Sequence, residues 1–244
     1  MNLKRFSTTA MAVCMGLLAT VLVTLAWSTS CDAKVLSYNY IEAEYGIDSS
    51  VQVEGGDFDS DDSITVEGSY LLHPNAFVWG RYNMANYDLT ASDDLWLHGA
   101  SLGVGFRKAL RKEPAETPID MFALVSYEYL ETKAEVSGTK ESLRKSGIGA
   151  KLGVRAALTK HFEMLADAYW LSYGGDIGKL LTRDGGLDGL AFELGGGLEL
   201  TDHCMLTATY ETGELDYKTI PLITAARDVE LDRDEVRLGF RYTF

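Results

Sequence analysis

Past residue 34, the sequence has no apolar run that is long enough to form a membrane-spanning helix. This absence excludes a helical membrane domain in that part of the chain. It does not exclude a closed β-barrel, because barrel strands give a much weaker hydropathy signal than membrane helices do. A hydropathy plot alone would class this part of the chain as soluble, and that conclusion can be wrong.

Basic residues are scarce. The 244 residues include 36 acidic and 22 basic side chains, which gives a formal net charge of −14. An acidic surface repels the phosphates of nucleic acid. The sequence therefore predicts no nucleic-acid partner.

The start of the chain differs in kind from the rest. A basic beginning is followed by an apolar run over residues 10–27 and then by small and polar residues. This order predicts a secretory signal peptide over residues 1–33, cut after Ala33, and a single domain over 34–244. Cleavage after Ala26 is one alternative. A retained membrane helix is another, because the run approaches the ~20 residues that span a bilayer.

Cysteine is nearly absent, with only Cys14, Cys31 and Cys204. Cleavage after Ala33 removes the first two, so no internal disulfide can then form. A lipid anchor on Cys31 is disfavoured, because Ser28 stands where such signals carry leucine.

Three related stretches join alternating runs through a tight polar turn. They read LLHPNAFVWGRY, LTKHFEMLADAYW and LTDHCMLTATYET, and they begin at Leu72, Leu158 and Leu200. A fourth copy with a longer, Pro-broken turn, FRKALRKEPAETPIDMF, lies between the first two. A repeat made of two strands and two connections predicts an array of hairpins.

Apolar and polar residues alternate with period 2 along these stretches, which predicts an all-β, antiparallel up-and-down barrel. We expect ten strands, with eight as the alternative if two weak strands are loops. The predicted strands cover residues 35–45, 63–72, 76–87, 96–107, 119–130, 147–158, 162–172, 190–200, 204–212 and 233–244.

The predicted connections alternate in length. Those at 73–75, 159–161 and 201–203 are short, whereas those near 46–62, 88–95, 131–146, 173–189 and 213–232 are longer and polar. Transmembrane barrels have this asymmetry, with short periplasmic turns and long external loops. We therefore interpret the chain as a transmembrane barrel whose two ends both return to the periplasm.

A soluble barrel would also alternate, so the placement of charge decides which face is inside. If the apolar faces meet lipid, the charged faces line the lumen and must pair there, and charges of both signs are present. Inward glycines would leave room for large side chains such as Trp79 and Phe122, so we expect a largely plugged lumen. The residues expected in the lumen charge network are Glu67, Arg81, Lys151, Arg155, Glu193, Glu199, Arg237 and Arg241.

The chain ends on RLGFRYTF, which resembles the C-terminal strand signature of bacterial outer-membrane proteins. The resemblance implies that Phe240, Tyr242 and Phe244 form an assembly signal for the barrel assembly machinery. The stretches LSYNYIEAEYG and GSYLLHPNAFVWGRYNMANYD are similar to a xanthomonad-type family of small proteobacterial outer-membrane barrels. That family belongs with the outer-membrane protein A and opacity-type barrels. It implies an outer-membrane location, with lipid and lipopolysaccharide as partners of a monomer.

No pattern in the sequence supports catalysis or metal binding. His98 and Ser101 are three residues apart on a strand and should face opposite sides. Asp93, Asp94 and His98 lack the second acidic pair that an omptin-type protease uses. The acidic stretch GIDSSVQVEGGDFDSDDS lacks the turn glycine of a calcium-binding loop. We therefore expect no catalytic residue, no metal and no cofactor.

These observations predict a non-enzymatic outer-membrane barrel with a structural or surface-interaction role and acidic external loops. A narrow, passive, porin-like channel with a weak cation preference is the alternative. A lipid-modifying enzyme or a protease is a weaker alternative, because the acid–base geometry is missing.

Overall fold

The computed structural model describes residues 36–53, 56–90, 93–110, 117–136, 139–174, 187–218 and 228–244. The predicted signal peptide lies outside these residues. The described chain forms ten strands: β1 (Tyr40–Val53), β2 (Gly56–His73), β3 (Ala76–Thr90), β4 (Asp93–Ala109), β5 (Ile119–Val136), β6 (Thr139–Ala157), β7 (Phe162–Gly174), β8 (Leu187–Glu199), β9 (Cys204–Lys218) and β10 (Asp228–Thr243). Within these ranges, no helix is long and apolar enough to cross a membrane.

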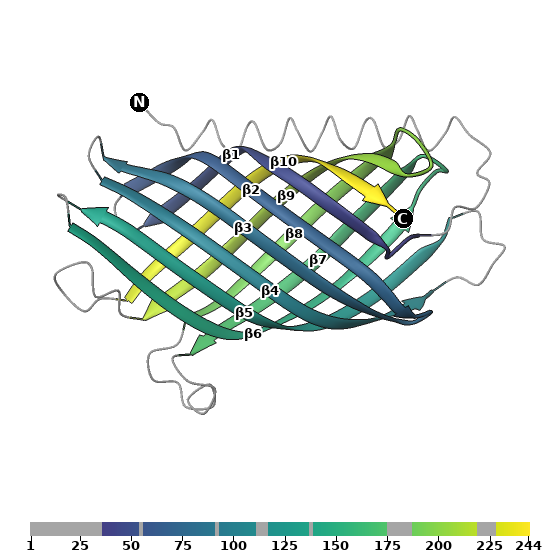
Figure 1. Cartoon of the computed structure of the whole chain (residues 1–244), viewed down its shortest axis with the longest axis horizontal. Coiled ribbons are helices and arrows are strands. Elements are labelled where there is room, and N and C mark those ends of the chain that lie inside the picture. The colour runs from purple at the N-terminus through teal and green to yellow at the C-terminus, as the bar shows by residue number, and fades with distance from the viewer. Residues whose placement is uncertain are drawn as a thin grey trace.

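The ten strands close into one barrel (Figure 1). Each strand pairs antiparallel with its sequence neighbours, and β1 closes the ring by pairing with β10 from Tyr40↔Thr243 onward. The prediction of ten strands is confirmed, and the eight-strand alternative is wrong. Closure gives each of the ten described strands a hydrogen-bonded neighbour on both sides, which a barrel in lipid requires.

Side chains alternate between an apolar outside and a polar inside. Leu102 and Leu238 point outward and are 68% and 44% exposed. Their inward neighbours Gly103 and Arg237 are buried. A barrel that fills its interior with charge and covers its exterior with aliphatic side chains suits a bilayer rather than water.

One end of the barrel carries the tight connections, and we call it the short-turn end. Three of its turns fall after His73, Ala157 and Glu199, and the C-terminal residue Phe244 lies at the same end (Figure 1). In the last of these turns, the Thr201 hydroxyl accepts a hydrogen bond from the backbone N of Cys204 at 3.1 Å. The boundaries predicted for this end agree with the structure to within two residues, except at the start of β1.

At the opposite end, the strands run further than the sequence pattern predicts. For example, residues 46–62 were expected to form a loop, but β1 continues to Val53 and β2 begins at Gly56. Beyond the apolar band both faces of a strand contact a polar environment, so apolar and polar residues no longer alternate with period 2. Backbone pairing between the strands continues without this alternation.

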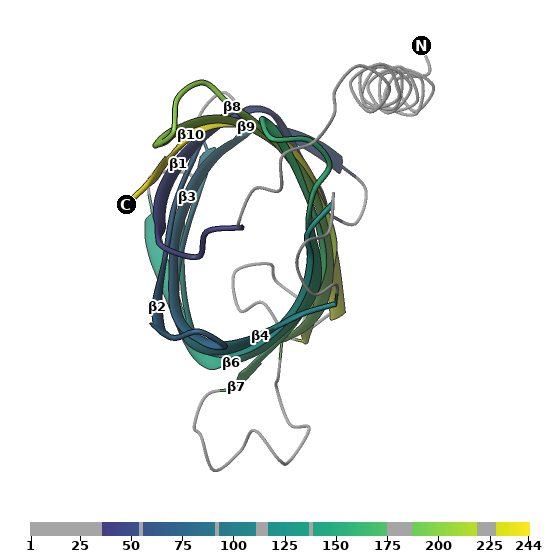
Figure 2. The same ribbon diagram turned by 90° about the vertical axis from the view of Figure 1, so that its right-hand side faces the viewer.

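The prediction is also wrong for the start of the first strand. We expected it at residue 35, but β1 begins at Tyr40. Residues 36–39 instead turn into the mouth of the barrel, where Leu36 and Tyr38 are each 2% exposed. Figure 2 looks along the barrel from the short-turn end and shows this purple segment turning from the barrel wall into the opening.

Inward glycines make room for inward rings. A Cβ atom on Gly105 would lie 2.7 Å from two ring carbons of Phe77, and one on Gly153 would lie 2.6 Å from a ring carbon of Phe122. Both distances are well below van der Waals contact. The two rings therefore occupy lumen space that only glycine leaves free.

Candidate functional site: the charged lumen

The charged side chains of the lumen come from the inward positions of many strands. Strand β10 supplies three of them, Arg233, Arg237 and Arg241. Alternate residues of a strand share a face, so residues that are four apart point the same way. Carboxylates from β1, β7, β8 and β9 lie within reach of these arginines. The result is a network that crosses the barrel rather than a set of isolated pairs.

Arg237 is the centre of this network and is only 1% exposed. Its Nε donates to Glu44 at 2.9 Å, and its Nη2 donates to Glu193 at 3.1 Å. Its Nη1 donates to Glu211 at 2.8 Å and to Glu235 at 2.9 Å. The planar guanidinium group has five N–H donors, so one arginine can hold carboxylates from several strands.

Two cations from the other wall join the same carboxylates. Nη2 of Arg81 on β3 donates to Glu211 at 2.6 Å, and its Nη1 lies 3.5 Å from Glu193. Nζ of Lys151 on β6 lies 3.1 Å from Asp167 and 3.9 Å from Glu193. Glu193 is thus shared by cations from β3, β6 and β10.

A second group of charges lies nearer the short-turn end. Arg241 donates to Glu42 at 2.8 Å and also binds Glu163, which pairs with Arg155 at 2.9 Å. The ring of Tyr40 lies beside the Arg241 guanidinium, 4.5 Å from its centroid. The Tyr40 hydroxyl donates to Glu67 at 2.5 Å.

All eight residues predicted for the lumen network lie on inward strand positions. Seven of them belong to the two groups above. Glu199, in contrast, is the last residue of β8 and lies half-buried at the short-turn end. Sequence reasoning did not include Glu211 or Glu44 in the network, although both share the inward phase of their strands.

An aromatic cluster fills the lumen at the short-turn end. It consists of Tyr38, Phe77, Trp79, Phe122 and Leu124, with Leu71 and Leu165 packed against it. The edge of Trp79 meets Tyr169 at 6.3 Å between ring centroids, and Lys151 Nζ lies 5.6 Å from both rings. The apolar cluster and the charged network therefore meet without a gap between them.

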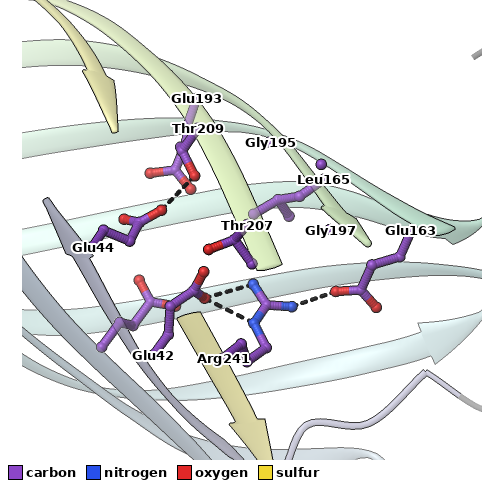
Figure 3. Close-up of a pocket in the computed structure, with 12 residues that line it drawn as sticks. Glu42, Glu44, Glu163, Leu165, Glu193, Gly195, Gly197, Thr207, Thr209 and Arg241 are labelled. Atoms are coloured by element: carbon purple, nitrogen blue, oxygen red, sulfur yellow. Dashed lines mark hydrogen bonds and ion pairs between the residues drawn. The ribbon is translucent and has the colours of Figure 1, made fainter. Parts of the chain in front are cut away.

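The described part of the lumen contains a small polar cavity. A cavity of about 20 Å³ lies among Glu42, Glu44, Glu163, Glu193 and Arg241 (Figure 3). Thr207 also borders this cavity, and its buried Oγ1 has no hydrogen-bond partner among the described residues. A polar space of this size accommodates one or two water molecules. It is too small for a nutrient or a nucleoside.

The residues considered for catalysis do not come together. His98 faces outward, and its Nδ1 lies 3.0 Å from the hydroxyl of Tyr82. Ser101 faces inward and donates to Glu128 at 2.5 Å. The side chains of Asp93 and Asp94 lie outside the described part of the structure. Within the described residues, no three His, Cys, Asp or Glu side chains are arranged to hold a metal ion.

The C-terminal residues point out of the barrel. Phe240, Tyr242 and Phe244 are each about half exposed. The ring of Phe244 stacks on Tyr70 of β2 at 6.3 Å between centroids. This places an aromatic surface at the seam where β10 meets β1, and its role as an assembly signal stays a prediction.

The chain was compared with known proteins. The profile of the outer membrane protein beta-barrel domain family matches residues 15–179. No curated protein sequence matches the chain.

Several solved structures are similar to this chain at low identity. Neisserial surface protein A is 12% identical, the match covers 86% of this chain and all of that one, and the TM-score is 0.46. Ail, the attachment invasion locus protein of Yersinia pestis, is 13% identical over 84% of this chain and 99% of its own, with a TM-score of 0.38. The outer membrane protease OmpT from Escherichia coli is 11% identical. The match covers 87% of this chain and 99% of OmpT, and the TM-score is 0.44.

At these identities and TM-scores the likenesses carry no argument about this chain, and the xanthomonad-type grouping stays a prediction. The family profile, in contrast, covers more than half of the chain, and the closed barrel with an apolar exterior agrees with it. The chain therefore belongs to the outer membrane protein beta-barrel domain family and is a protein of the outer membrane.

Proposed function

We propose that this protein is a non-enzymatic, monomeric outer-membrane barrel with a structural or surface-interaction role and a lumen that is closed to solutes. The observation that carries the proposal is the filled interior. The ion-pair network around Arg237 occupies the middle of the lumen, and the aromatic cluster occupies its short-turn end. By the rule for outer-membrane barrels, the short-turn end faces the periplasm.

The outer surface supports lipid and lipopolysaccharide as its surroundings. Tyr45 and Tyr210 point outward, and their hydroxyls donate to Asp62 at 2.6 Å and to Asp234 at 3.0 Å. Tyrosine with an apolar ring and a polar tip suits the boundary between acyl chains and headgroups. The opposite faces of His98 and Ser101 favour a non-enzymatic role.

Planar-bilayer recording of the purified protein tests the closed lumen. We expect no conductance steps above the bilayer background. Reproducible steps of a defined size would refute the closed lumen. Mass spectrometry of lipid A from cells with and without the gene tests the non-enzymatic role, and a change in acylation that depends on the gene would refute it.

A narrow cation-preferring channel is the second candidate, and one observation favours it. Carboxylates outnumber cationic groups among the described lumen residues, so a water-filled path there would attract cations. The bilayer recording separates the two candidates. A channel of this kind would give small steps, and the reversal potential in a KCl gradient would shift toward the potassium potential.

A further inference from the structure

We infer that residues 36–39 form a plug that seals the short-turn mouth of the lumen and keeps water away from the other members of the aromatic cluster, which pack against Tyr38. The inference rests on the closed lumen proposed above and identifies the segment that closes it at this end.

The burial of the plug is the first observation. Chain segments that precede the first strand of a domain are usually solvated. Here Leu36 and Tyr38 are both 2% exposed, which is as buried as any side chain of the aromatic cluster. Figure 2 shows the segment turning from the barrel wall into the opening.

The ring of Tyr38 is held on several sides. It packs against Phe77 at 5.1 Å between ring centroids. The guanidinium groups of Arg107 and Arg155 lie 4.9 and 4.8 Å from its centroid. These contacts join the plug to the aromatic cluster and place two cations against one ring.

The same two arginines also bind the backbone of the plug. Nη1 of Arg107 donates to the carbonyl oxygen of Leu36 at 3.2 Å, and Nη1 of Arg155 donates to that of Ser37 at 2.9 Å. Arg155 belongs to β6, which lies across the ring from β1. The plug is therefore tied to the far wall of the barrel.

Asn39 ties the other end of the plug to the near wall. Its side-chain oxygen accepts a hydrogen bond from the backbone N of Leu71 at 2.7 Å. Its carbonyl oxygen accepts one from the backbone N of Phe244 at 3.1 Å. With anchors on β2, β4, β6 and the C-terminal residue, the plug is held from both walls of the mouth.

The chain supplies a matched control for the ring. The buried hydroxyl of Tyr38 has no hydrogen-bond partner among the described residues. Tyr38→Phe should therefore leave the seal intact, whereas Tyr38→Ala removes the ring that both arginines and Phe77 contact. Leu36→Ala is a milder second variant, in case Tyr38→Ala fails to fold.

Trp79 is the reporter, because it belongs to the aromatic cluster and is 3% exposed. In the full chain, Trp27, Trp96 and Trp170 are replaced by phenylalanine so that only Trp79 fluoresces. Acrylamide quenching is then measured in detergent micelles, on variants whose barrel is shown to be closed by its heat-dependent gel shift. We expect the quenching constant to rise roughly twofold or more in Tyr38→Ala, since the mouth opens to water, and to stay unchanged in Tyr38→Phe.

Equal quenching in folded Tyr38→Ala and Tyr38→Phe would overturn the plug. If Tyr38→Ala does not fold, equal quenching in Leu36→Ala and the unsubstituted reporter would do the same. The closed lumen fails separately, through conductance of the unsubstituted protein. A silent bilayer with unchanged quenching would therefore refute the plug alone.

Discussion

Replacing Arg237 with methionine tests whether the lumen network stabilises the barrel. Methionine keeps much of the side-chain volume but removes every N–H donor. Four carboxylates lie within 3.1 Å of the guanidinium nitrogens and would lose this partner. Removing one partner of a buried ion pair costs roughly 3–5 kcal/mol, because the remaining charge stays buried without compensation.

The neighbours of Arg237 refine that magnitude. Glu193 and Glu211 keep Arg81, and Glu235 keeps Arg233 at 2.5 Å. Glu44 keeps only the Thr209 hydroxyl at 2.5 Å among its described hydrogen bonds and ion pairs. The loss should therefore fall near the lower end of the range, at about 3 kcal/mol, and most of it should come from Glu44.

The assay is equilibrium unfolding by urea in lipid vesicles, followed by the heat-dependent gel shift. Arg144→Met is the matched control, because Arg144 pairs with Glu131 on an exposed surface and its side chain is 67% exposed. We expect no shift of the unfolding midpoint in this control. Adding Glu44→Gln to Arg237→Met should restore part of the lost stability, with a coupling energy of roughly 0.5–3 kcal/mol.

One result would refute this reasoning. If Arg237→Met unfolds at the same urea concentration as Arg144→Met, the cost of dehydrating the lumen charges cancels their attraction. The network would then determine which strands pair, but it would not stabilise the barrel.

Two further predictions concern the outer face. Leu238→Arg places a charge on the lipid face, where Leu238 is 44% exposed, and should cost ~2–4 kcal/mol if the site lies near the bilayer midplane. A normal yield of heat-modifiable barrel in that variant would contradict it. Deleting Phe244 removes the ring that stacks on Tyr70 and should slow insertion and expose the chain to periplasmic proteases. Unchanged outer-membrane levels, measured by fractionation and immunoblot, would show that the C-terminal ring is dispensable.

Some of the candidate site could be predicted from single strands. Inward positions such as Arg237 and Lys151 follow from alternation within one strand. The partners of each charge do not follow, because Arg81 and Glu211 are 130 residues apart and meet only when the ring has closed. The contribution of Glu44 escaped prediction for the same reason.

The start of β1 shows a different limit. Tyr38 and Tyr40 make the alternation ambiguous there, and the pattern cannot distinguish a strand from a segment that turns into the lumen. The segment enters the lumen because Arg107 and Arg155, which lie far along the chain, donate hydrogen bonds to its backbone carbonyl oxygens. The local sequence does not contain that information.

The sequence by itself determined the up-and-down barrel, the alternation of the two faces along each strand and the positions of the short turns. These features depend on residues close together in the chain, and each is repeated along its length. Only the tertiary structure decided which charges pair, how far the strands extend beyond the apolar band and that residues 36–39 enter the barrel. Those features depend on the strand register around the closed ring, which brings distant residues within hydrogen-bonding range.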